Sequence, residues 1–162
     1  MASASLDHAG GEPAAGTAPP AQQQPALRPE YWRAQALLQI MPPWLEHGRD
    51  HEHGGFYTGL ARDWQQVGGT EKYPTMIGRH LYSLSAAFLL SGDEEYLRLA
   101  RDTAAWLIAH GWDETFGGWY RAVTETGEPA DTAKDAFTQM YANTGLALYY
   151  LATRDAAARR CL

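Results

Sequence analysis

The sequence predicts an all-α protein built from helical hairpins that stack side by side. One observation is an internal repeat, in which a turn and the helices around it recur about 63 residues later, from Asp50 to Asp113. The other is helical spacing of apolar residues in the long segments between the recurrences. A repeat of this size is typical of units that bury their flanks against their neighbours. The recurring turn residues are Asp50, Gly54, Gly55, Phe56 and Tyr57, which return as Asp113, Gly117, Gly118, Trp119 and Tyr120.

Composition divides the chain of 162 residues into a tail and one globular unit. Residues 1–29 are rich in Ala, Pro, Gln and Gly and lack the basic and apolar regions of a signal peptide. Such a segment buries too little apolar surface to offset its ordering entropy, so we expect a disordered tail followed by a domain at 30–162. The single cysteine, Cys161, rules out an intrachain disulfide framework and fits a cytoplasmic protein.

Charge and hydropathy narrow the class of partner. The net charge is −6 and the pI is about 5.4, so no basic surface is expected for a nucleic acid or an anionic membrane. The longest apolar run, at 84–90, is far too short to span a bilayer. The composition suits an acidic enzyme that acts on a neutral or anionic small molecule.

The first predicted helix covers residues 29–45, where apolar and aromatic residues recur at helical spacing. We expect Pro42 and Pro43 to distort this helix or to end it early, because proline lacks the N–H and clashes with the preceding turn. A loop should follow from 46 to about 54.

The second and third helices are expected at 74–91 and 94–110. Gly92 is placed to adopt the left-handed conformation that ends many helices, and Asp93 is a good N-cap for the third helix. Gly111 should end that helix. The pattern therefore predicts a helical hairpin.

A fourth helix is predicted at 133–152, and by the repeat Asp155 should cap a fifth helix at 156–162. Paired glycines in the recurring turns allow positive φ, and the aromatic residues after them should anchor each loop. We expect short extended pieces or small hairpins at 56–58 and 119–123.

The motifs, in their order and spacing, resemble the opening of the N-acylglucosamine 2-epimerase family, which includes cellobiose 2-epimerases and mannose-type isomerases. The similarity covers roughly residues 31–155. The motifs are Asp50-x-x-x-Gly54-Gly55-Phe56-Tyr57, Lys72, Arg79-His80-Leu81-Tyr82, Gly92-Asp93-x-x-Tyr96-Leu97, Asp113-x-x-x-Gly117-Gly118-Trp119-Tyr120, Gly127-x-Pro129 and Lys134-x-x-Phe137-x-Gln139-x-Tyr141-Ala142.

The resemblance implies an α/α toroid of the (α/α)6-barrel type, in which six hairpins surround a sugar pocket. Six such repeats need on the order of 370 residues, so the chain is expected to hold four helices and the start of a fifth, as the N-terminal portion. Family members invert C2 of a sugar or interconvert aldose and ketose by histidine-mediated proton transfer beside the carbonyl. No cofactor is implied, and a homodimer is an option for the full-length protein.

The resemblance places the catalytic histidines and their supporting glutamate on later hairpins. We therefore expect no catalytic residue within this chain and no turnover by the chain alone. Abstraction of a proton next to a carbonyl needs a base with a pKa near neutrality and a group that stabilises the resulting oxyanion. No histidine pair in the sequence is convincingly placed for that chemistry.

Arg79 is the first candidate for substrate binding. The resemblance puts it on an inner helix, where a guanidinium can hydrogen-bond sugar hydroxyls and stabilise negative charge on the carbonyl oxygen. The alternative is an exposed or ion-paired helix arginine. The family has a Gln two residues earlier, and this chain has Ile77 there.

Four further residues are candidates for the sugar site: Phe137, Tyr141, Met76 and Tyr73. Phe137 and Tyr141 lie one helical turn apart on one face. The family commonly has Tyr at the first of these positions, so Phe137 keeps a stacking surface but lacks the hydroxyl. Aromatic residues at helical spacing are more often core residues, and that alternative stays open.

Other polar residues are expected to be structural. His80 lies about 100° around the helix from Arg79, so we interpret it as a packed or partly exposed histidine. The run 51–53 (His-Glu-His) lacks further ligands, so no metal site is predicted there. Lys72 and Lys134 recur in the repeat, which indicates a structural salt bridge at the entry of each hairpin.

Two alternatives to an epimerase or isomerase remain open. One is a six-hairpin glycoside hydrolase or unsaturated-uronyl hydrolase, which needs acidic residues aimed into the pocket. The other is an inactive helical-repeat fragment. The sequence does not separate N-acyl sugars, hexoses, disaccharides and sulfonated sugars as substrates.

Overall fold

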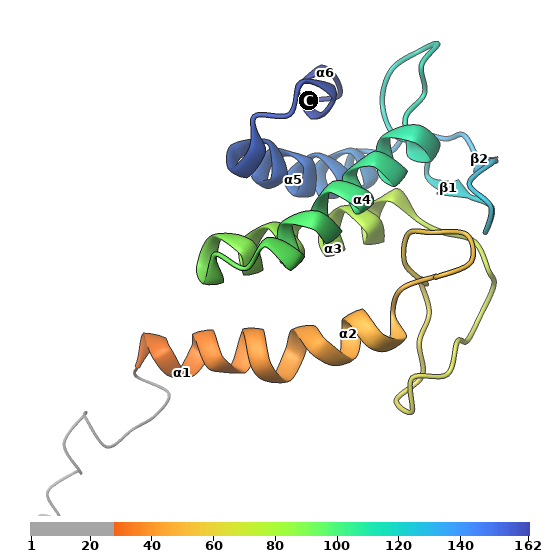
Figure 1. The fold of residues 1–162 in the computed structure, drawn as a ribbon. Helices are drawn as coiled ribbons and strands as arrows, with labels where there is room; N and C mark the ends of the chain where they lie inside the picture. Colours follow the sequence, from red (N-terminus) through yellow and green to blue (C-terminus); the bar gives the residue numbers. More distant parts are fainter. Residues whose placement is uncertain (1–27) are drawn as a thin grey trace, which may run out of the picture.

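The computed structural model describes residues 28–162 and is mostly helical (Figure 1). The predicted disordered tail falls almost entirely on residues 1–27, which lie outside the described residues. Along the chain come one long helical segment, a hairpin of two helices, a further long helix and a short last helix, as the repeat predicts.

The first helical segment runs without a break through α1 (Pro29–Ala34), the π-helical turn η3 (Gln35–Ile40) and α2 (Met41–His47). The Met41 N–H donates to the Ala36 carbonyl, five residues back, as in a π-helix. The prediction that Pro42 and Pro43 distort this helix is confirmed, but the prediction that they end it early is wrong. The wide turn comes just before the prolines, which then occupy the first positions of α2, where a missing N–H costs little.

The hairpin of α3 (Pro74–Ser91) and α4 (Glu94–Gly111) has the predicted end signals. Gly92 adopts φ 72° and its N–H donates to the Phe88 carbonyl. The carboxylate of Asp93 accepts a hydrogen bond from the Glu95 N–H and caps α4. Helix α4 extends one residue beyond the predicted end and includes Gly111.

Helix α5 (Ala136–Thr153) begins three residues later than predicted. Asp135 is its N-cap, because one carboxylate oxygen accepts from the Thr138 N–H at 2.9 Å. The last helix, α6 (Ala156–Arg160), is capped by Asp155 as the repeat predicts.

Helices α3 and α5 pack against each other more extensively than any other pair, and α3 also packs against α4 (Figure 1). Glycines allow the two backbones of α3 and α5 to touch. A Cβ placed on Gly145 would lie 2.0 Å from the carbonyl oxygen of Gly78, which no real side chain tolerates. The small residues therefore fix how these two helices cross.

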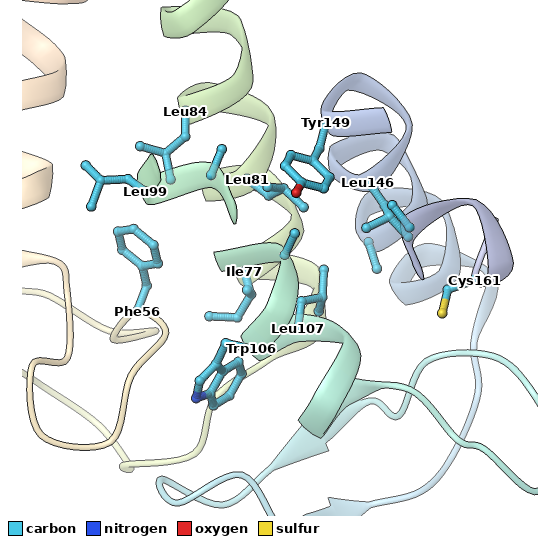
Figure 2. Close-up of a cluster of buried hydrophobic side chains, with 14 of the residues drawn as sticks. Phe56, Ile77, Leu81, Leu84, Leu99, Trp106, Leu107, Leu146, Tyr149 and Cys161 are labelled. Carbon is cyan, nitrogen blue, oxygen red and sulfur yellow. The ribbon is translucent and has the colours of Figure 1, made fainter. Parts of the chain in front are cut away.

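The core lies between α3, α4 and α5, as Figure 2 shows. Ile77 and Leu81 of α3, Leu107 of α4 and Leu146 of α5 are fully buried. Phe56, from the first glycine-rich turn, is also buried in this cluster and anchors its loop as predicted.

The second glycine-rich turn leads into a small hairpin of β1 (Ala122–Val123) and β2 (Pro129–Asp131), which pair antiparallel. The first turn forms only isolated bridges, including the one between Arg49 and Phe56. The expectation of an extended piece and a small hairpin is thus confirmed for the second turn, whereas residues 56–58 have only the bridge at Phe56.

Each recurring lysine forms the predicted ion pair. Lys72 Nζ lies 2.7 Å from Asp50 Oδ2 and also donates to the carbonyls of Gly54 and Glu125, so this buried ammonium has three acceptors. Lys134 pairs with Asp113 in the second repeat. The glycine-rich turn and the next helix are therefore tied together twice by the same device.

Among residues 28–162, no helix has both the length and the apolar character needed to cross a membrane.

Candidate functional site

A hollow of about 370 Å³ opens beside the first turns of α3 and α5. Four of the five predicted substrate-binding residues, Tyr73, Met76, Arg79 and Phe137, lie around it. The fifth, Tyr141, lines an adjoining hollow that also contacts Arg79. The full lining of the first hollow is Thr58, Tyr73, Thr75, Met76, Arg79, Arg121, Asp135, Phe137 and Thr138.

Arg79 is held by aromatic faces rather than by carboxylates. Its guanidinium carbon lies 3.9 Å from the ring centre of Tyr141 and 5.7 Å from that of Phe137. The two rings contact each other edge to face, with centres 4.7 Å apart. Among residues 28–162, the hydrogen-bond contact of the guanidinium is a weak one to the Met76 sulfur, at 3.8 Å. Within the described part of the chain, no carboxylate forms an ion pair with Arg79.

The register of the repeat explains why Arg79 and Tyr141 meet. Helix α3 begins at Pro74 and α5 at Ala136, so Arg79 and Tyr141 occupy equivalent positions in neighbouring helices. The close crossing beside Gly78 brings these positions together. Phe137, one turn earlier on α5, is more than half exposed and lines the hollow rather than the core.

Arg121 also lines the hollow, and sequence reasoning missed it. It immediately precedes β1, and its Nε donates to Asp135 Oδ2 at 3.1 Å while its Nη1 donates to Asp131 Oδ2 at 3.0 Å. The hydrogen bond with Asp135 raises the pKa of Arg121. Its repeat equivalent, Thr58, lines the same hollow, and that equivalence is the signal that could have identified Arg121.

The floor of the hollow includes two threonines, one from each helix. Thr75 Oγ1 donates to Thr138 Oγ1 at 3.3 Å, and both residues are buried. Thr138 also donates, through its N–H and its hydroxyl, to the Asp135 carboxylate. The hydrogen bond from the Thr138 N–H is the largest influence on the pKa of Asp135 and lowers it, so this carboxylate stays ionised.

His80 is packed beside the hollow, as predicted. Its ring stacks on Phe56 with centres 4.0 Å apart, and the Trp44 ring centre lies 5.4 Å away. The Nε2 atom is buried and has no hydrogen-bond partner within the described part of the chain. Burial lowers the pKa of His80 to about 4, so the imidazole is neutral near pH 7.

The structure separates the residues of the His-Glu-His run. His51 and Glu52 are exposed, whereas His53 joins Asp50 and Glu125 in a group whose possible ligand atoms lie within 4.8 Å of one another. The Asp50 carboxylate already bonds the Lys72 ammonium, which supplies the positive charge there. Burial raises the pKa of Asp50, but hydrogen bonds from His53 N–H, Lys72 and Glu52 N–H outweigh it, and the net pKa is lowered.

Comparison with known proteins identifies the family. The model of the N-acylglucosamine 2-epimerase family matches residues 54–161, well over half of the chain. The chain belongs to this family. The match spans both glycine-rich turns, both recurring lysines and the whole α3–α5 contact.

Individual members of the family are similar to this chain in sequence. A cellobiose 2-epimerase from Bacteroides fragilis is 36% identical over 117 residues, which are 72% of this chain and 30% of that protein. A cellobiose 2-epimerase from Eubacterium cellulosolvens is 33% identical over 119 residues, 74% of this chain and 29% of that protein. The rat N-acylglucosamine 2-epimerase is 44% identical over a shorter stretch of 48 residues, 30% of this chain and 11% of that protein.

Solved structures show the same fold over part of their length. The cellobiose 2-epimerase of Spirochaeta thermophila superposes with a TM-score of 0.72 at 30% identity, covering 80% of this chain and 32% of the other. A D-mannose isomerase superposes with a TM-score of 0.58 at 22% identity, covering 86% of this chain and 37% of the other, and shows the fold alone. The chain thus spans about a third of the length of these (α/α)6-barrel relatives.

Proposed function

We propose that this chain supplies one wall of the sugar-binding site of a sugar 2-epimerase or aldose–ketose isomerase, in an (α/α)6 barrel. Arg79 is the central binding residue, with Tyr73, Met76, Phe137 and Tyr141 around it. The observation that carries this proposal is an arginine at the hollow with aromatic faces beneath it and no carboxylate partner among the described residues. Its N–H donors are available to a ligand.

The chemistry of the reaction fits such an arginine. Removal of the proton next to a sugar carbonyl places negative charge on the carbonyl oxygen, and a guanidinium stabilises that charge by hydrogen bonding. Tyr141 and Phe137 hold the guanidinium by cation–π contact, which fixes its plane without neutralising its charge. A carboxylate partner would have weakened this stabilisation.

A hydrolase is less well supported. Hydrolysis of a glycosidic bond needs two carboxyl groups across the bond. Asp135 is the one acidic residue among the described residues around the hollow, and it already caps α5 and bonds Arg121. A single committed carboxylate does not supply an acid and a base.

Proton transfer needs groups other than the described residues around this hollow. None of its lining residues is a histidine, and the neighbouring His80 is packed against Phe56. We therefore expect the chain alone to bind sugar without turning it over. Incubation with mannose, cellobiose or N-acetylglucosamine in D₂O, followed by NMR of the C2 proton, should show no exchange.

Binding can be measured through the methionine methyl groups. The chain has four methionines, and Met76 lines the hollow, so 13C-methyl labelling gives a simple spectrum with a reporter in the site. Titration with the three sugars should shift the Met76 signal saturably for at least one of them. Arg79→Leu should weaken that binding by about tenfold or more, because it removes charge-assisted hydrogen bonds.

Arg98→Leu is the matched control. Arg98 is an exposed arginine of α4 that pairs with Glu95 and Asp102, away from the hollow. The Arg98→Leu variant should bind sugar as tightly as the parent chain does. Absence of any saturable shift, or equal binding by the Arg79→Leu variant, would overturn the proposed function.

A further inference from the structure

One side of α5 carries an uncharged, exposed stripe along the length of the helix. Its residues follow one another at spacings of three and four, so they share one face. A helix at the surface of a soluble protein normally turns polar residues to water, so this face is suited to cover by another body. The α5 stripe consists of Phe137, Met140, Thr144, Ala147 and Leu151.

A groove lies on another side of the molecule, between α3 and the first helical segment. It is made of two adjoining cavities of about 200 Å³ each, which share Ile40, Met41 and Ser83 in their lining. Met76 lies at one end of this α3 groove and Leu90 at the other. The lining is mostly apolar, so the groove is suited to an apolar side chain rather than to water.

The internal repeat relates the α5 stripe to a contact that the chain already makes. Helix α5 begins 62 residues after α3, so positions in the two helices correspond at that offset. In the contact between the helices, α3 presents Thr75 and Gly78 to α5. The corresponding positions of α5 are Phe137 and Met140, both on the stripe. The α5 stripe is therefore the same face that α3 buries.

The α3 groove corresponds in the same way to the other side of that contact. Helix α5 presents Thr138 and Gly145 to α3. The corresponding positions of α3 are Met76 and Ser83, which both line the groove. A stripe placed in a groove would therefore repeat the α3–α5 contact one unit further along a stack of repeats.

The side chains suit this second contact. At the position where Gly78 meets Gly145 within the chain, the new contact has Met140 against Ser83. The two backbones then lie further apart, and the Met140 side chain has a cavity beside Ser83 to fill. Methionine adapts well to irregular apolar gaps. The stripe brings no charge into the contact, so no ion on that side loses its water.

We propose that the α3 groove binds the α5 stripe of a second copy of this chain, and that three copies close a ring. The contact is head to tail, so copies add in one direction until the ring closes. The Spirochaeta thermophila relative is about three times as long as the part that this chain covers, so three copies supply a similar number of helices. Phe137 of each copy then lies beside Met76 of the next, and a neighbouring copy completes each site.

Two short helices compete for one place in such a ring. By the repeat, α1 begins the helix before the first glycine-rich turn, and α6 begins the corresponding helix of a third unit. The α6 helix of one copy therefore meets α1 of the next. None of the α1 residues is buried, whereas Ala158 and Cys161 at the other end are buried. We expect α1 to give way, while η3 keeps its contact with α3.

Sedimentation of the 162-residue chain over a wide range of concentration tests the number of copies. A closed ring predicts a particle of three times the chain mass of 17.9 kDa, which dissociates to monomer on dilution. Met140→Lys changes the stripe and Ser83→Lys changes the groove, and both positions are exposed in the single chain. Each variant should associate about tenfold more weakly or worse, because it places an unpaired charge in an apolar contact.

Phe116→Lys is the matched control, because it adds the same charge at an exposed aromatic residue of the second glycine-rich turn. This variant should associate as the parent chain does. Thermal melting of the three variants shows whether each is folded. A loss of association by Phe116→Lys as large as that by Met140→Lys would overturn the proposal, since charge alone would then explain the effect.

Mixing the two variants tests the direction of the contact. The Ser83→Lys chain keeps an intact stripe, and the Met140→Lys chain keeps an intact groove. One copy of each should form a complex of two chains, although either variant alone stays a monomer. Formation of this complex also proves that both variants are folded. A symmetric contact between identical faces would not give this complex.

A disulfide tests the register of the contact. Met140→Cys on one copy and Ser83→Cys on another should join under mild oxidation, whereas either variant alone should not. Leu151→Cys lies about 16 Å further along α5 and should not join Ser83→Cys. The native Cys161 is buried, so it should not interfere.

The outcomes decide between occupants of the groove. A monomer at every concentration overturns the proposal and leaves the groove and the stripe to helices of a different polypeptide. Association that persists in both lysine variants, or a mixture that forms no two-chain complex, overturns it as well. Open polymers that depend on both surfaces support the contact and overturn the ring of three. The contact does not depend on sugar, so failure of the proposed sugar binding leaves this inference standing.

Discussion

At the scale of single residues, the polar groups of this chain fall into two kinds. Asp50 and Lys72 neutralise each other in the interior, where the ammonium has three acceptors and no exposure. His80 is a partly buried, neutral ring whose buried Nε2 has no hydrogen-bond partner among residues 28–162. Arg79, by contrast, is exposed on a helix face and supported by rings. Buried groups here serve stability, while the exposed arginine is available to a ligand.

His80 should make the stability of the fold depend on pH. Its pKa is about 4 in the folded chain and 6.5 in the unfolded chain, so below pH 6.5 the unfolded chain binds the extra proton. The stabilising contribution is complete above pH 6.5 and is lost as pH falls towards 4. The full loss is about 3 kcal/mol at most.

Urea unfolding between pH 7.5 and 4.5 measures this effect. His80→Phe keeps an aromatic ring against Phe56 and removes the titration, so its stability should change less over that interval. His51→Asn is the control, because His51 is exposed and its replacement should leave the slope unchanged. Parallel pH curves for the parent chain and His80→Phe would contradict this prediction.

The two repeat lysines should differ in importance. Lys72→Met removes a buried ammonium and leaves the Asp50 carboxylate charged in the interior. The free energy of unfolding should fall by about 3 kcal/mol or more. Lys134→Met should cost clearly less, because the Lys134 side chain is partly exposed and water can reach its site. Chemical denaturation of both variants checks the order, and a larger loss for Lys134→Met would contradict it.

At the scale of elements, glycines decide how α3 and α5 meet. Gly78 and Gly145 allow direct backbone contact, and this contact brings Arg79 of one helix onto Tyr141 of the other. The π-helical turn in the first segment acts similarly, because it lets a helix with two consecutive prolines continue to His47. Local backbone features thus position the elements that carry the candidate site.

A methyl group added at the α3–α5 crossing should therefore strongly destabilise the fold. Gly145→Ala places Cβ 2.0 Å from the Gly78 carbonyl oxygen, so the helices must move apart. We expect a loss of about 3 kcal/mol, at the upper end for overpacked cores. The Arg79–Tyr141 contact should loosen as well, which lowers any sugar affinity.

Gly69→Ala is the matched control for that substitution. Its Cβ would meet nothing closer than the Glu71 nitrogen at 4.0 Å, so thermal melting should shift little. A Gly145→Ala variant as stable as Gly69→Ala would show that the crossing tolerates a wider separation.

At the scale of the whole molecule, apolar side chains remain uncovered on several helices. Among the described residues, these side chains lie on the first helical segment, on α3 and on α5. Patches of this kind are uncommon on monomeric soluble proteins and mark surfaces that contact another body. Those at least half exposed are Trp32, Leu38, Ile40, Leu89, Leu90, Phe137, Met140 and Leu151.

The isolated chain should therefore bind a hydrophobic dye and self-associate as its concentration rises. Sedimentation and dye fluorescence measure the two effects. The double variant Leu38→Lys and Ile40→Lys should reduce both, because it places charge on the exposed face of the first segment. A concentration-independent monomer without dye binding would show that these faces do not associate.

The sequence predicted the order of helices, the caps at Asp93 and Asp155 and the two lysine ion pairs, because each depends on residues close in sequence or on the repeat. Asp93 and Asp155 cap their helices through bonds to N–H groups two or three residues ahead. At Pro42 and Pro43 the same local logic predicted a distortion but not the continuation of the helix to His47, because no propensity encodes the wide turn before the prolines. Arg121 was missed because its partners lie on other elements.

By itself the sequence determined the helical repeat and the glycine-rich turns, because local hydrogen bonds and regular spacing express these directly, and the resemblance of its motifs indicated the family. The tertiary structure alone decided which residues share the hollow. Because the backbones of α3 and α5 touch at glycines, the hollow brings together Tyr73, Met76, Arg79 and Phe137. The hairpin of β1 and β2 adds Arg121. Contacts between distant segments depend on how whole elements pack, and spacing along the chain does not specify that packing.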